Sequence, residues 1–410
     1  MNYFKVYKLK QLFKLFIFIF SIAILLVFSK ENFESVKQSI TMFISSVAPS
    51  LFPFIFFTEF ILGTEIIILL AEFIGKYIQK IFGTSKNSTI AIIIGFLCGF
   101  PMGAKAVSNI YEKGIISKKE ANRLLTFVNN NNPIFILSTI GIAAFHNISI
   151  GILLLISHYL SAILIGFFGN IFNTLFIIHK KDKNLNSFNE NNIKSKLIFE
   201  KKYSNISFFD LVKKSILNSF VTLGMILGFI ILFNLFFSII KVVLVNLNVD
   251  SNIIACLSGL FEVTKGIMNV SITDIPIQNK ILISSFLLGF SGLCIISQIY
   301  STVYMHKISI KNILFPKFLQ GIFSFFITYI LLRYGNFNIT ETQTVFNNSS
   351  TNIDYEYFFE NLKKSYINST LIIIAVLCII MIINKILINK KKKDISSLHY
   401  SKLKDKKKVV

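Results

Sequence analysis

The chain has 410 residues, of which 53% are hydrophobic, and its mean hydropathy is +0.67. This composition excludes an ordinary soluble globular protein and is typical of a polytopic helical membrane protein. The formal net charge of +22 does not indicate a nucleic-acid partner, because the lysines gather beside apolar runs, as the positive-inside rule predicts. These clusters lie near the N-terminus, in residues 179–202 and in residues 390–408.

Three apolar stretches open the chain. Residues 12–29 are long for the core of a signal peptide and lack a clean cleavage site, so we interpret them as a retained membrane span. Residues 40–62 contain Pro49 and Pro53, which predict two half-helices or a kinked span. Residues 64–82 carry charges at four-residue spacing on one helix face, which fits an interfacial helix or a span inside the bundle.

The next run, residues 88–105, begins as an apolar helix and then breaks. Three glycines and a proline occur within nine residues, in Gly95-Phe-Leu-Cys-Gly99-Phe-Pro101-Met-Gly103-Ala-Lys105. Glycine loosens a helix, and proline removes a backbone donor and clashes with the preceding turn. Freed backbone groups cannot reach water in hydrocarbon, so such a break survives only where it is buried in protein or lines a cavity. A broken, charged membrane helix is typical of a transport site.

The remaining elements follow in order. Residues 117–127 predict a polar helix with Glu120 and Arg123 on its solvent side, and four asparagines before Pro133 open a run to about residue 145. Further apolar segments cover 149–178, 218–242, 252–269, 280–304, 313–333 and 368–389. We therefore expect about 8–10 membrane segments. The expected parts are 1–37 (first span and connector), 38–178 (first half), 179–206 (polar cytoplasmic loop), 207–334 (second half), 335–367 (polar loop) and 368–410 (last span and basic tail).

The two halves share an internal repeat at an offset of 193 residues. Cys98-Gly99 then pairs with Ser291-Gly292, and Lys105 pairs with Gln298. A second match relates Glu59, with Gly63 after it, to Glu262, with Gly266 after it. Breaks at corresponding places of two halves indicate the binding site of a transporter.

Lys105 is the first candidate for substrate binding. A lysine at the centre of a bilayer costs roughly 2.5–3.5 kcal/mol on insertion scales, so it usually has a partner or a purpose. If it is buried beside Gly99, Pro101 and Gly103, its ammonium and the backbone amides at a half-helix N-terminus form an anion site. The alternative is that Lys105 reaches the headgroups, where a lysine extends its amine to water at little cost.

Two carboxylates and two sets of neutral polar groups are further candidates. Glu59 and Glu262 lie in apolar runs, where a carboxyl group without a partner favours its protonated form and suits proton coupling or substrate binding. The alternative for Glu262 is a local ion pair with Lys265. The other candidates for substrate contact are Asn130, Pro133, Ser297 and Gln298, for which helix capping and helix packing are the alternatives.

No catalytic or metal-binding constellation is present in the sequence. It lacks a phosphate-binding P-loop and a zinc motif, and its cysteines and histidines have no metal-ligand spacing. We therefore expect neither an enzyme nor a cofactor or metal, and no transport driven by ATP within this chain.

These motifs together resemble a known family. Gly99-Phe-Pro101-Met-Gly103-Ala-Lys105, Asn130–Pro133, Gly259-Leu-Phe-Glu262 and Gly292-Leu-Cys-Ile-Ile-Ser297-Gln298 are similar to motifs of the sporulation integral membrane proteins of the YlbJ type, over roughly residues 40–335. The resemblance implies an all-α polytopic membrane protein built from two gate-like repeats with broken or re-entrant helices. It also implies the nucleoside-recognition or gate domain, related to concentrative nucleoside transporters.

The resemblance further implies a function. We expect a solute transporter of sporulation that moves dipicolinic acid, a small aromatic dicarboxylate, across the outer forespore membrane. A nucleoside-type transporter and a structural or assembly protein of the spore envelope are the alternatives. The expected partners are a small anionic aromatic substrate and the lipid bilayer, with a homo-oligomer or other sporulation membrane proteins left open. A cation beside glycine amides suits the dianion better than a neutral nucleoside.

Overall fold

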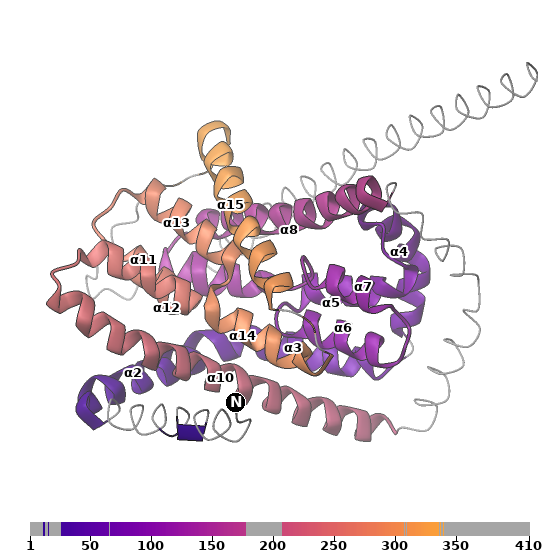
Figure 1. The fold of residues 1–410 in the computed structure, drawn as a ribbon, viewed down its shortest axis with the longest axis horizontal. Coiled ribbons are helices and arrows are strands. Elements are labelled where there is room, and N and C mark those ends of the chain that lie inside the picture. Colours follow the sequence, from indigo (N-terminus) through magenta and orange to yellow (C-terminus); the bar gives the residue numbers. More distant parts are fainter. Residues whose placement is uncertain are drawn as a thin grey trace, which may run out of the picture.

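The computed structural model describes residues 11, 12, 15, 26–64, 66–177, 207–306, 308, 310–335, 337 and 339. All of the regular elements among them are helices, drawn in Figure 1, and five helical segments are long and apolar enough to cross a membrane. The protein is thus an all-α polytopic membrane protein. The expected first span, the loops 179–206 and 335–367, and the last span with its tail lie wholly or mostly outside the described residues.

The second apolar run forms one continuous helical segment. Helix α2 (Ser29–Met42) leads through a π-helical turn, η1 (Phe43–Val47), into α3 (Ala48–Leu62). The π turn directly precedes Pro49, whose missing N–H removes a helical hydrogen bond. Of the two expected arrangements, the structure shows a locally distorted span and not two separate half-helices.

The first half continues with α4 (Ile66–Phe82), the short η2 (Lys86–Ser88) and a helical hairpin. The hairpin consists of α5 (Thr89–Leu97) and α6 (Met102–Glu112), and its bend lies at residues 98–101, where the sequence predicted the break. The next elements are α7 (Lys118–Leu124), η3 (Phe135–Ala144) and the long α8 (Ile148–Ile177). Asparagines 129–132 form an unwound segment between α7 and η3.

The second half repeats this order. The long α10 (Phe208–Asn246) precedes a second hairpin of α11 (Ser251–Phe261) and α12 (Val263–Ser271), with Glu262 in extended conformation at its bend. An interrupted helix follows, built from α13 (Ile277–Phe290) and α14 (Gly292–Val303) with Ser291 at the interruption. The described part of this half closes with η5 (Tyr304–His306) and α15 (Lys311–Tyr334).

Each half therefore contains a helical hairpin followed by an interrupted helix, which corrects the register of the predicted repeat. The arms of each hairpin pack against each other, so the bend at 98–101 corresponds to the bend at Glu262, and the asparagine segment corresponds to Ser291. The offset of 193 residues instead paired a hairpin bend with an interrupted helix. The error arose because both kinds of break use the same small residues, and a sequence match cannot distinguish how the chain continues.

The two halves interlock. Helix α6 of the first hairpin packs against α14, and α12 of the second hairpin packs against η3, so each hairpin contacts the interrupted helix of the other half. In Figure 1 the first hairpin with α7 lies at one end of the molecule and α11–α13 at the other, with α3 and α14 between them. This arrangement brings the breaks of both halves into the interior.

The polar helix α7 corrects a second expectation, because Glu120 and Arg123 are only partly exposed and their charged groups bind neighbouring segments of the protein. The Glu120 carboxylate accepts from the Ser85 backbone N–H, with an N···O distance of 2.6 Å, and from the Ser88 hydroxyl. Arg123 donates to the carbonyls of Phe82 and Gly83. Both charged side chains thus bind α7 to the end of α4 and to the turn that follows it. Helical periodicity does not reveal such a contact between distant residues.

Candidate functional site

The bend of the first hairpin is held tightly against the asparagine segment. Gly99 adopts a φ of +80°, which side chains strongly disfavour, and the Phe100 N–H donates to the Asn130 carbonyl at an N···O distance of 2.9 Å. A Cβ on Gly95 would lie 2.0 Å from the Val128 carbonyl oxygen. The glycines therefore allow two backbone segments to approach each other. The amides of Phe100 and Gly103 both donate within the protein, which weakens the expectation that this bend offers free amides to an anion.

All four asparagines of the unwound segment are fully buried. Asn132 caps η3, since its side-chain oxygen accepts from the Ile134 N–H at 2.8 Å. Asn131 makes contacts beyond those of a helix cap. Its side-chain amide nitrogen donates to the Leu288 carbonyl of α13 at 3.0 Å, and its backbone carbonyl accepts from the Tyr159 hydroxyl at 2.9 Å. The segment thus joins the first half to the interrupted helix of the second half. Pro133 follows it at the start of the next helix, as predicted.

Glu262 forms the bend of the second hairpin and is almost completely buried, with 2% of its surface exposed. Its carboxylate accepts from the backbone N–H groups of Thr264 and Lys265, at N···O distances of 2.9 and 2.7 Å, and so caps α12. The carboxylate therefore accepts from the backbone N–H of Lys265. The alternative considered from the sequence was an ion pair with the Lys265 side chain. A negative charge at this helix N-terminus is also favoured by the helix dipole.

The interruption of the second half lies against this bend. Ser291 and Gly292 both have positive φ, at +71° and +72°, and a Cβ on Gly292 would come within 3.1 Å of the Gly259 carbonyl oxygen. In the second turn of α14, Gln298 is 3% exposed and donates to the Cys294 sulfur at 3.2 Å. The Gln298 side-chain oxygen is buried and has no hydrogen-bond partner among the residues that the structure describes. An unpaired buried acceptor is costly, so this oxygen is a candidate contact for a ligand.

These breaks surround a small internal cavity of about 10 Å³, roughly the room of one water molecule. Its polar wall consists of Glu262, Thr264, Cys294 and Gln298, and its apolar wall includes Phe100 and Phe135 beside the two breaks of the first half. The structure therefore brings Glu262, Gln298, the Gly99–Pro101 bend and Asn130 into one region. Ser297 is only half-buried and is not part of the cavity wall.

Lys105 and Glu59 are not part of this cavity wall but form an ion pair elsewhere. The Lys105 amine lies 2.6 Å from one Glu59 oxygen, and the Asn218 amide of α10 donates to the other at 2.8 Å. The Lys105 side chain is 38% exposed, whereas that of Glu59 is 7% exposed. Each charge thus has its counter-charge within the protein. The sequence analysis considered an anion site or a headgroup contact for Lys105, and the structure shows neither. The ion pair also weakens the expectation that Glu59 takes part in proton coupling.

The ion pair leads to a prediction about stability. Lys105→Met leaves the buried Glu59 without a counter-charge, so we expect it to lower the unfolding free energy by about 1–2 kcal/mol, a modest value because Lys105 is partly exposed. Adding Glu59→Gln to this variant should restore part of the loss. Thermal unfolding of the parent, both single variants and the double variant in detergent checks this. Additive effects of the two substitutions would mean that the pair contributes nothing.

The sequence interpretation missed three polar residues behind the asparagine segment: His158 on α8, and Lys317 and Gln320 on α15. All three are fully buried. The Asn131 N–H donates to the His158 ring at 3.0 Å, and the Gln320 amide donates to the Asn130 side chain at 3.1 Å. A signal was present in α15, where Lys317, Gln320, Ser324 and Thr328 recur at helical spacing within an apolar run. This pattern predicts a polar face turned into the bundle.

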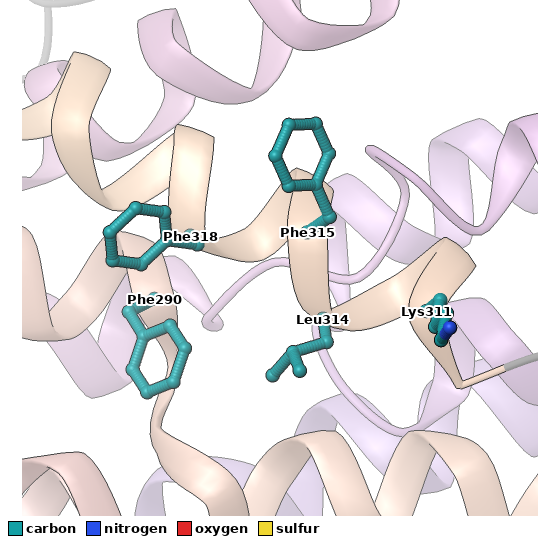
Figure 2. Close-up of a pocket in the computed structure, with 5 residues that line it drawn as sticks. All are labelled: Phe290, Lys311, Leu314, Phe315 and Phe318. Atoms are coloured by element: carbon teal, nitrogen blue, oxygen red, sulfur yellow. The ribbon is translucent and has the colours of Figure 1, made fainter.

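A larger hollow, of about 630 Å³, lies outside this site. It is open, and Figure 2 shows its lining residues Phe290, Leu314, Phe315 and Phe318 with Lys311 at one end. It belongs to α13 and α15, both within candidate membrane spans. Because its walls are aromatic and aliphatic, it lacks the convergent polar groups that orient a solute, and we assign it to the lipid-facing surface.

Comparison with known proteins places the chain in a family. It is 30% identical over 328 residues to the sporulation integral membrane protein YlbJ of Bacillus subtilis (strain 168), and the match covers 75% of this chain and 79% of the relative. No family profile matches the chain, and no solved structure matches it. Since that identity extends over more than two thirds of both chains, this protein belongs to the family of sporulation integral membrane proteins of the YlbJ type.

Proposed function

We propose that the protein is a solute carrier of sporulation that moves a small aromatic dicarboxylate, dipicolinate, across the outer forespore membrane. The observation that carries the proposal is the meeting of four backbone interruptions, two hairpin bends and two unwound segments, near one small cavity whose mostly apolar wall includes Glu262, Thr264 and Gln298. In membrane carriers, irregular backbone at the interface of two repeats is where solutes bind. The name of the Bacillus relative supports the setting in sporulation.

A purely structural role in the spore envelope explains this interior poorly. Every polar group buried in a membrane protein costs free energy unless it is paired. Yet buried side-chain oxygens of Asn129, Asn131 and Gln298 lack hydrogen-bond partners within the described part of the chain. A scaffold gains nothing from such groups, whereas a carrier needs acceptors and donors that a solute can satisfy.

The described conformation is closed. A cavity of about 10 Å³ cannot hold an aromatic dicarboxylate, so the substrate requires the hairpins to separate from the interrupted helices. The contacts between α6 and α14 and between α12 and η3 are the ones that would change, because they close the cavity from both halves. This is the expected behaviour of a carrier that alternates between openings to the two sides of the membrane.

A nucleoside carrier is the second candidate, and the cavity wall favours it. Glu262, Thr264 and Gln298 offer an acidic group, a hydroxyl and an amide, which suit a neutral ring with several donors. A dianion instead needs positive charge. The Lys317 amine lies behind the asparagine segment and outside the cavity wall, but it lacks a carboxylate neighbour among the described residues, so when protonated its field favours a negatively charged solute in this region. We give more weight to this field than to the composition of the wall.

The deciding experiment is uptake into proteoliposomes that contain the purified full-length chain. We expect saturable uptake of labelled dipicolinate, above that of protein-free liposomes and competed by unlabelled dipicolinate, with uridine and adenosine inactive as competitors. Uptake with and without an imposed proton gradient then identifies the coupling. Uptake of nucleosides alone would replace the proposal by the second candidate. Absence of uptake for all of these solutes, with protein that remains folded, would favour the envelope role.

A further inference from the structure

Lys317 places a buried amine where the described residues offer no acidic partner. Its side chain is fully buried in α15, and its amine donates to the backbone carbonyl of Asn129 and to the side-chain oxygen of Gln320, the latter at 2.9 Å. Both acceptors are neutral. Within the described parts of the chain, no carboxylate oxygen lies within 4.0 Å of this amine. Burying an ammonium group in a membrane interior is costly, and such residues mark functional positions.

The surroundings of the amine explain what it does. Asn129 lies in an unwound segment, so its carbonyl cannot accept the regular helical hydrogen bond and needs another donor. The Lys317 ammonium is that donor, and Gln320 fixes the next residue by donating to the Asn130 side chain at 3.1 Å and to the His158 carbonyl at 3.4 Å. Two side chains one turn apart on α15 thus hold two consecutive residues of the segment.

This contact reaches the cavity through the backbone. The Asn130 carbonyl accepts from the Phe100 N–H at 2.9 Å, and Phe100 is part of the cavity wall. The chain of contacts runs from Lys317 and Gln320 through the asparagine segment to the bend of the first hairpin. We propose that Lys317 is a positioning residue of the transport site, whose buried amine, together with Gln320, holds Asn129 and Asn130 unwound and thereby sets the bend at 98–101. The effect of Lys317 on transport rests on the proposed function, whereas its effect on the bend does not.

The first test measures the bend itself and requires no substrate. Cys98 directly precedes Gly99 at this bend and is half-buried. In a full-length protein with Cys256, Cys294 and Cys378 replaced by serine, Cys98 is the single thiol. We expect Lys317→Met in this background to raise the rate of Cys98 labelling by a water-soluble maleimide at least about tenfold. The matched control is Lys311→Met, which removes an exposed lysine from the same helix and should leave the rate unchanged.

A second variant, Gln320→Leu, tests the same contact with the asparagine segment in case Lys317→Met does not fold. Gln320→Leu keeps the lysine but removes the contact to Asn130, so we expect a smaller, severalfold increase in Cys98 labelling. Size-exclusion chromatography and circular dichroism establish that each variant is folded. If both Lys317→Met and Gln320→Leu are folded and label at the parent rate, the positioning role is wrong.

The third measurement separates this inference from the proposed function. If the parent protein takes up dipicolinate, Lys317→Met should lower the maximal rate of uptake at least about tenfold, while Lys311→Met retains the parent rate. Unchanged uptake by Lys317→Met would overturn the inference and leave the proposed function intact. If the parent takes up no dipicolinate, the proposed function fails, and the labelling of Cys98 still tests the role of Lys317.

Discussion

Gly266→Val is expected to prevent the second hairpin from closing and to cause a large loss of stability. A Cβ at Gly266 would lie 2.0 Å from the Gly259 Cα and 2.3 Å from the Gly259 nitrogen. Both are backbone atoms, so no side chain can rotate away to relieve the overlap. Overpacking usually costs about 1–3 kcal/mol, and we expect a value at or above the upper end of that range.

The measurement for this variant is the yield of monodisperse protein in detergent and its thermal unfolding temperature. Gly228→Val is the matched control, because it places the same side chain in the apolar helix α10, where a Cβ on Gly228 would meet nothing within 4 Å. The control should behave like the parent protein. A Gly266→Val protein with parental yield and unfolding temperature would contradict the close packing of α11 on α12.

Two different substitutions of Glu262 are expected to separate its role as the cap of α12 from its expected role in proton-coupled transport. Glu262→Ala leaves the N–H groups of Thr264 and Lys265 without their acceptor in a buried position, at a cost of about 1–3 kcal/mol for each group. Glu262→Gln keeps one side-chain oxygen as an acceptor and removes the charge. We therefore expect the alanine variant to be unstable, and the glutamine variant to fold but to lose most of its uptake.

Uptake by Glu262→Gln as a function of a proton gradient is the informative measurement, since a group that exchanges protons during transport cannot be replaced by an amide. Glu34→Gln, a change of the same chemistry at an exposed position of α2, is the control and should transport normally. Full, gradient-dependent uptake by Glu262→Gln would exclude proton coupling by Glu262 and leave it as the cap of α12.

Several features of the fold could be predicted from local sequence. The break near Gly99 was predicted correctly because glycine and proline act on their own turn of the chain, and the polar asparagines before Pro133 were correctly expected to open a new helix. The extended residue Glu262 was harder to foresee. Nothing in Gly259-Leu-Phe-Glu262 breaks a helix by itself, and the bend exists because the two arms pack through Gly259 and Gly266.

The candidate site was predicted only in part. Glu262 and Gln298 meet at the cavity as residues of broken segments, but Lys105 received more weight than its ion pair with Glu59 supports. Both residues were recognised as charges in apolar runs. Their pairing was not, because 46 residues separate them and the contact depends on how α6 lies beside α3. Lys317 was missed for the same reason, since its partner Asn129 is 188 residues away.

Composition and local motifs were enough to identify a helical membrane protein, the break near Gly99, the new helix after the asparagines, and the family to which the chain belongs. These properties follow from composition and from residues that act within a few positions of one another. The folded structure was needed to show that the chain bends at Glu262, which interruptions correspond in the two halves, which charges neutralise each other, and that a lysine supports the unwound asparagines. Those outcomes depend on contacts between distant segments, because in a membrane interior without water the partners of buried polar groups come from parts of the chain that local sequence does not specify.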